Sequence, residues 1–271
     1  MKRRGGFTLA EILVAVVLLG IVGLGISQLL VSQTRFFARA TGARDARAVA
    51  RNALNIVRDE MRMIEPRGIS AASTTSITVN VPYAMGVNCA ASTVAFIPVD
   101  SLTRATAVFR GYAHRDTSLN SPYTYVSSTT APSAGSSLTC TAVGITPITG
   151  APLLVLSPAL PVLSAGAPVL LYQRITYALA ASTLVPGRTA LWRTVTGGAA
   201  EEVAVPFENT AIFRYYVSGA STSQANPPGS LNTITGIELV LVGESERNSP
   251  GTNAPEQSSV RLSIFFRNAV F

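Results

Sequence analysis

The chain has 271 residues, of which 48% are hydrophobic and only 13% are charged, with 21 basic residues against 14 acidic ones. Low charge combined with ordinary hydrophobic content argues against a disordered chain, and the length suffices for one large domain or a smaller domain with an extension. One histidine and two cysteines are too few ligands for a zinc site, so neither a metal nor another cofactor is expected. The basic residues are scattered, so no nucleic-acid partner is expected.

The chain begins with a short basic stretch followed by a long apolar run. Residues 1–6 read MKRRGG, and apolar residues follow without interruption from Ile12 to Ile26. The segment from Phe7 to Val31 has 25 residues, about 37 Å as a helix, which is enough to cross the hydrocarbon core of a membrane. The basic residues ahead of it indicate a cytoplasmic N-terminus and an exported remainder.

Three interpretations of this segment compete. A cleaved secretory signal needs a pair of small residues at a site directly after the apolar run, and residues 38–40 offer only a poor, late one. A plain membrane anchor gives no reason for Glu11, because a carboxylate inside a membrane helix costs about 3 kcal/mol. The third interpretation, a processed filament subunit, accounts for both the apolar run and the carboxylate.

That third interpretation rests on a resemblance. Residues 5–11, GGFTLAE, followed by an apolar helix resemble the processing motif of type IV prepilins and type II secretion pseudopilins. The resemblance implies cleavage between Gly6 and Phe7 by a prepilin peptidase, N-methylation of the new Phe7 amine, and Glu11 as the fifth residue of the mature chain. It also implies a single pass through the inner membrane, followed by incorporation into a pilus or pseudopilus with other minor and major pilins or pseudopilins.

Glu11 and Phe7 are the predicted assembly residues. The Phe7 amine and the Glu11 carboxylate are opposite charges near one membrane leaflet, and burial of each costs free energy while it is unpaired. When subunits stack with an axial offset, Glu11 of one subunit can meet the Phe7 amine of its neighbour, and a subunit out of register leaves both groups unpaired. The alternative is a glutamate that only reaches for the headgroups.

The helix is expected to continue beyond the membrane. Over residues 32–65 apolar residues recur at helical spacing with arginines between them, and Pro66 with Gly68 is a stop signal. We expect one helix of roughly 88 Å from Phe7 to Glu65. Its first half, residues 7–31, would anchor the chain, and its amphipathic second half would pack on a head.

After the helix the pattern changes to strands, so the predicted fold class is α+β: the type IV pilin fold, a long N-terminal helix packed on an antiparallel sheet. Residues 66–271 are expected to form a β-rich extracytoplasmic head. The predicted strands, separated by turn signals, are 75–81, 92–99, 107–113, 168–179, 190–195, 203–217, 235–242 and 260–267.

The head contains a low-charge insert at about 117–173, because no charged residue lies between Asp116 and Arg174. Two interpretations remain open: a loop region that meets a neighbour or a surface, and a long connection in a low-charge extracellular fold, which the sequence favours. The two cysteines, Cys89 and Cys140, are predicted to form a disulfide, since the head is expected in an oxidising compartment. Two buried thiols are the alternative.

No enzyme motif is present in the sequence, and no catalytic residue is assigned. Nucleophile-elbow, phosphate-loop, dinucleotide and zinc-protease patterns are all missing. His114 is expected on the surface. The oxygens of Glu244, Glu246, Asn248 and Asn253 suit calcium, but a solvated turn is the favoured interpretation.

Length and the C-terminal half point to one branch of the pilin-like proteins. Removing residues 1–6 leaves 265 of 271 residues, which is long for a major pilin and suggests a minor component. Segments that resemble the PilW and GspJ branch are 172–177 (YQRITY), 190–193 (ALWR), 213–216 (FRYY) and 260–268 (VRLSIFFRN). The resemblance implies a minor pilin that helps to prime a type IV pilus at its tip. The alternatives are a J-type minor pseudopilin of a type II secretion system and, more distantly, a membrane-anchored binding protein.

Overall fold

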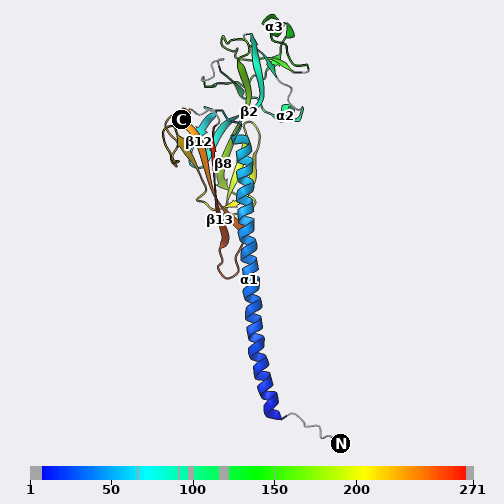
Figure 1. The fold of residues 1–271 in the computed structure, drawn as a ribbon, viewed down its shortest axis with the longest axis vertical. Coiled ribbons are helices and arrows are strands. Elements are labelled where there is room, and N and C mark those ends of the chain that lie inside the picture. Colours follow the sequence, from blue (N-terminus) through cyan, green and yellow to red (C-terminus); the bar gives the residue numbers. More distant parts are fainter. Residues whose placement is uncertain are drawn as a thin grey trace.

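The computed structural model describes residues 8–65, 67–90, 92–96, 101–115, 122–149 and 151–266. A single long helix, α1 (Leu9–Met61), projects from a β-rich head (Figure 1). Within the described residues, thirteen strands form one sheet in which every recorded strand pair is antiparallel. The predicted α+β class, with the helix packed on an antiparallel sheet, is confirmed.

The remaining elements follow in chain order. The first half of the head contains β1 (Ile69–Ala72), β2 (Ser76–Ala90), β3 (Thr93–Phe96), α2 (Ser101–Thr106), β4 (Gly111–His114), β5 (Thr124–Ser127), β6 (Ser133–Ala134), α3 (Ser137–Ala142) and β7 (Leu153–Val155). The second half contains β8 (Pro168–Ala181), β9 (Thr189–Val195), β10 (Ala200–Phe207), β11 (Ile212–Val217), the short 3-10 helix η1 (Leu231–Thr233), β12 (Ile234–Asn248) and β13 (Pro255–Phe265).

Helix α1 ends four residues before the predicted Glu65. Its last turn tightens, because the backbone N–H groups of Met63 and Ile64 donate to carbonyls only three residues back. This tighter path buries Ile64, which is 2% exposed, in the same core as Met61. The chain therefore leaves the helix early to place one more apolar side chain under the sheet.

The main core lies between the C-terminal half of α1 and the sheet. The buried side of the helix consists of Ala46, Ala50, Ala53, Leu54, Val57 and Met61, and β10, β12 and β13 are its main partners. Gly243 makes this packing close, since a Cβ there would lie 2.1 Å from the carbonyl oxygen of Ala46. A small-residue row on the helix and a glycine on the strand thus bring the two backbones together.

Most predicted strands exist, with different limits. β2 continues past the predicted end at Val81 to Ala90, because a register shift between Pro82 and Ala84 accommodates the proline in the strand. The predicted strand 203–217 is wrong as a single element: it divides into β10 and β11 around a turn at Asn209 and Thr210.

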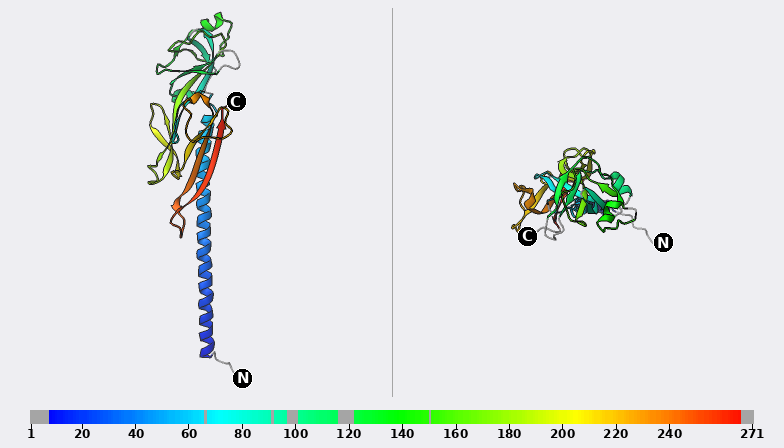
Figure 2. Two further views of the ribbon diagram at one scale, coloured as in Figure 1. Left: turned by 90° about the vertical axis from the view of Figure 1, so that its left-hand side faces the viewer. Right: turned by 90° about the horizontal axis from the view of Figure 1, so that it is seen from above.

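The upper ends of β2 and β8 carry a second group of elements, which we call the distal lobe (residues 84–90, 92–96, 101–115, 122–149 and 151–172). It contains β3 to β7 with α2 and α3, and it lies beyond the C-terminal end of α1 (Figures 1 and 2). Buried members of its own apolar cluster include Val94, Phe96, Tyr112, Leu156, Leu160 and Val169. The low-charge insert is therefore folded in its described parts, which differs from the favoured interpretation of a long connection.

Candidate functional site

The predicted processing residues, Gly6 and Phe7, lie outside the described residues, and the described site begins at Thr8. Thr8 caps the N-terminus of α1 and forms a capping box with Glu11. The backbone N–H and the hydroxyl of Thr8 donate to Glu11 Oε2 at 2.9 and 3.0 Å, and the Glu11 N–H donates to Thr8 Oγ1 at 3.3 Å. The carboxylate is thus held over the first helical turn, where the helix dipole favours a negative charge.

The apolar part of α1 is left uncovered by the rest of the chain. Every large apolar side chain from Leu9 to Val31 is between 49% and 82% exposed, and the first fully buried helix residue is Ala46. This helix is long and apolar enough to cross a membrane. An exposed apolar surface of this extent needs a membrane or other apolar helices to cover it.

The C-terminal end of α1 is fastened to the sheet by a polar contact that sequence reasoning missed. Glu60 accepts a hydrogen bond from the Tyr177 hydroxyl at 2.6 Å and two from the Arg193 guanidinium at 2.7 and 3.0 Å. Burial and the neighbouring Glu60 carboxylate raise the pKa of Tyr177 above its usual range. Tyr177 and Arg193 belong to two of the segments that carry the family resemblance. Glu60 belongs to no motif, so nothing in the sequence marked it as a residue that contacts the sheet.

A third segment of the resemblance, residues 213–216, also has a packing role. Tyr215 is fully buried, and its hydroxyl donates to the carbonyl of Ser73 at 2.6 Å. Its neighbour Arg214 forms an ion pair with Glu238 at 3.2 Å and also donates to Ser223. These contacts hold β11 to the adjoining loops and to β12.

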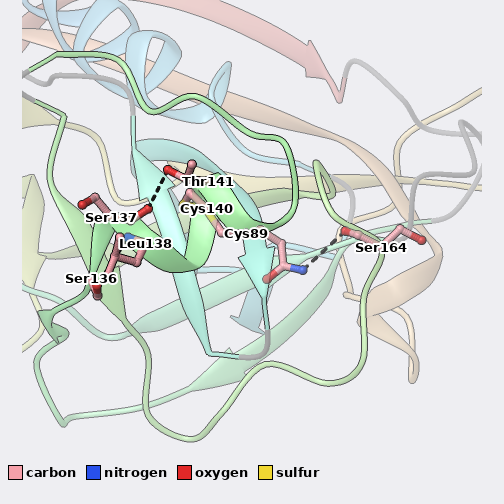
Figure 3. The surroundings of a disulfide bond; sticks show 8 residues. Cys89, Ser136, Ser137, Leu138, Cys140, Thr141 and Ser164 are labelled. Carbon is pink, nitrogen blue, oxygen red and sulfur yellow. Dashed lines mark hydrogen bonds between the residues drawn. A yellow bond between two sulfur atoms is a disulfide. The ribbon is translucent and has the colours of Figure 1, made fainter.

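Cys89 of β2 and Cys140 of α3 are joined by a disulfide in the structure, with their Cα atoms 4.6 Å apart (Figure 3). Both are almost fully buried. Ser136 caps α3 by accepting from the Leu138 N–H, and on the other side of β2 the amide of Asn88 donates to the carbonyl of Ser164 at 3.4 Å. The disulfide therefore connects the helix at the end of the distal lobe to its central strand.

Two expectations about polar residues are wrong. His114 is only 8% exposed, in β4, rather than on the surface, and burial lowers its pKa. Glu244 lies in β12 rather than in a solvated turn; it is 3% exposed, pairs with Arg188 at 3.0 Å and accepts from Gln257 at 3.0 Å. In the described parts of the chain, no cluster of three or more histidine, cysteine, aspartate or glutamate side chains is arranged to hold a metal ion.

Comparison with known proteins identifies the start of the chain. Residues 1–27 match the model of the prokaryotic N-terminal methylation motif, which is found in a family of structural subunits. No curated protein and no solved structure matches the chain. The motif implies processing by prepilin peptidase and assembly with other pilins. The chain therefore carries the prepilin methylation motif on a membrane-length apolar helix, features consistent with a type IV pilin-like protein.

Proposed function

We propose that this chain is a minor pilin of a type IV pilus, which helps to prime filament assembly at the tip. In this proposal the leader is cleaved off between Gly6 and Phe7. Before assembly, the chain is anchored in the inner membrane with its head on the extracytoplasmic side. The observation that carries the proposal is the position of Glu11, on the first turn of a membrane-length helix that the head leaves uncovered.

The capping box supports a role for Glu11 in subunit register. Among the residues that the structure describes, the donors to this carboxylate are the neutral N–H and hydroxyl of Thr8. A cationic amine of Phe7 from a neighbouring subunit would form a stronger, charge-assisted bond. The capping box thus holds the Glu11 carboxylate at the helix terminus through weak, neutral hydrogen bonds. The Phe7 amine of a correctly placed neighbour could replace these bonds with a stronger one.

The attachment of the head supports a structural subunit. Glu60 is bound by Tyr177 and Arg193, and Gly243 lies against the backbone at Ala46. With the helix and the head joined in this way, the register of the helix in a filament core sets the position of the head on the filament surface.

The distal lobe supports a place at the tip. It projects beyond the C-terminal end of α1, away from the apolar segment (Figure 1). In a filament of parallel, axially staggered helices, the head of the next subunit away from the membrane would lie on that side. A lobe in this position is accommodated most easily where no further subunit follows, at the end of the filament.

The test is the amount of surface pili sheared from cells that lack this gene. Loss of pili, restored by the unaltered gene but not by Glu11→Ala, would support a priming minor pilin. Unchanged pili with secreted proteins retained in the envelope would instead favour a J-type minor pseudopilin. Unchanged pili and unchanged secretion would overturn both and favour a membrane-anchored binding protein.

A further inference from the structure

We infer that the uncovered part of α1 just beyond its apolar segment binds anionic phospholipid headgroups on the membrane face nearest the head. We call this part the collar and define it as Arg35, Phe36, Phe37 and Arg39. The inference rests on the membrane insertion contained in the proposed function, but not on a role in a pilus.

The collar is positively charged, and no acidic side chain of the described residues forms an ion pair with its arginines. Between Glu11 and Asp45 every charged residue is an arginine. All side chains from 32 to 39 are exposed, and within the described part of the chain the recorded ion pairs include neither Arg35 nor Arg39. Positively charged residues are usually more frequent on the cytoplasmic side of a membrane span than on the exported side. An anionic partner outside the chain would account for these two arginines on the exported side.

The collar continues the helix row that packs on the head. In steps of three or four residues, the row through Arg35 and Arg39 continues along the same side of α1 to positions 42, 46, 50, 53, 57 and 61. From Ala46 to Met61 this row is buried under the sheet, whereas at Arg35 and Arg39 it is exposed. The two arginines therefore lie directly below the covered part of the row.

The lower end of the head lies close to the collar. The hairpin between β12 and β13 descends along α1 (Figures 1 and 2). A groove between them is lined by Phe37 and Gly42 on the helix and by Ser249 and Pro250 on the hairpin. The collar is thus the boundary between the head and the apolar segment.

The depth of the collar fits the headgroup layer. With Val31 as the last apolar residue of the span, Arg35 lies about 6 Å and Arg39 about 12 Å further along the axis. The headgroup zone is about 5–8 Å thick on each side, and helical side chains lean toward the N-terminus, here toward the membrane. Both guanidinium groups can therefore reach phosphates, which they bind in a bidentate manner.

The aromatic residues agree with this placement. Phe36 and Phe37 are 68% and 66% exposed, and their rings are 6.0 Å apart in an edge-on arrangement. Aromatic rings next to basic side chains are typical of helices at the membrane–water boundary. The rival partner, an acidic surface on a neighbouring subunit, explains the arginines but not two uncovered rings at the depth of the headgroups.

The test is native mass spectrometry of the full chain in a neutral detergent, titrated with palmitoyl-oleoyl phosphatidylglycerol. We expect the variant Arg35→Gln/Arg39→Gln to bind this lipid about 30-fold more weakly than the unaltered chain. The matched control is Arg47→Gln/Arg51→Gln, which removes two exposed arginines from the helix beside the head and should leave lipid binding unchanged. Circular dichroism should be the same for all three proteins, because every altered side chain is exposed.

Equal lipid binding by the collar variant and the unaltered chain would overturn the inference, as would an equal loss in the control. Unchanged lipid binding together with reduced cross-linking of the collar variant to other pilins would identify the acidic surface of a neighbour as the partner. The experiment uses purified protein, so its outcome is independent of whether cells that lack the gene make pili.

Discussion

At the residue scale, Glu11 has two separable roles, because the same carboxylate caps the helix and carries the charge proposed for assembly. Its recorded hydrogen-bond donors are the N–H and hydroxyl of Thr8, and a neutral amide oxygen can accept from both of them in the same geometry, although more weakly. Substitution can therefore remove the charge and keep the cap.

We expect Glu11→Gln to start α1 normally and to insert in the membrane, yet to enter filaments as poorly as Glu11→Ala. The reason is that pairing with a cationic amine requires the carboxylate, whereas the cap does not. Immunoblots of sheared filaments and of membrane fractions measure the two steps. Filament incorporation of Glu11→Gln at the level of the unaltered chain would show that the charge is not the register device.

Processing also depends on a single position in the proposed scheme. Gly6→Ala is expected to block removal of the leader, because the resemblance places cleavage directly after this glycine. Intact-mass measurement of the membrane-bound chain should then show the six leader residues retained, whereas Gly5→Ala serves as the control and should be processed. A mature mass in Gly6→Ala would refute the cleavage site.

At the element scale, the packing of α1 on the sheet depends on one glycine. Gly243→Ala places a Cβ 2.1 Å from the carbonyl oxygen of Ala46, so helix and strand must separate. We expect a loss of about 1–3 kcal/mol in the free energy of unfolding, measured by denaturant titration of the full chain in detergent. Gly229→Ala is the matched control, since no atom lies within 4 Å of its Cβ position; equal effects of both would contradict the close approach.

The polar contact at the end of α1 gives a second prediction for the same interface. Of the donors to Glu60 in the described part of the chain, Arg193→Ala leaves the Tyr177 hydroxyl alone. Because the Glu60 carboxylate is partly buried, we expect this change to destabilise the fold by about 2 kcal/mol. Arg58→Ala removes a more exposed pair with Asp59, at 3.4 Å, and should change stability little. A similar unfolding midpoint for Arg193→Ala and Arg58→Ala would show that Glu60 does not fasten the helix.

At the scale of the whole molecule, the head has two parts with separate cores, joined by β2 and β8. The cluster that includes Ala50, Val57 and Tyr177 lies between α1 and the sheet, and the distal lobe has its own smaller clusters. The disulfide of Cys89 and Cys140 belongs to the distal lobe alone. Its effect should therefore be confined to that lobe.

Reduction of the disulfide is expected to loosen the distal lobe while the sheet on α1 stays folded. Closing a loop across 51 positions contributes about 4 kcal/mol by restricting the unfolded chain. Hydrogen exchange with and without reductant measures this: amides of β3 and β7 should exchange faster, and those of β12 should not. Uniform protection in both states would show that the lobe does not depend on the disulfide.

The sequence by itself determined the features that repeat over short distances. The apolar segment, the presence of one long N-terminal helix and the strands 168–179, 190–195 and 235–242 follow from local patterns, and each corresponds to an observed element. The short processing motif is likewise a contiguous pattern, so the sequence alone identifies it. Local patterns predict such elements because neighbouring side chains share one helix face or one side of a strand.

Only the tertiary structure decided which distant residues meet. Glu60 bonds to Arg193 across 133 positions, His114 is buried by strands of the distal lobe, and Gly243 matters only because a helix lies on it. The strands β5, β6 and β7, which lie wholly within the low-charge insert, are only two to four residues long, too short to show a periodic pattern. Their order comes from long-range pairing, since β5 pairs with β4, β7 pairs with β3, and β6 pairs with β7. A local pattern does not contain these contacts.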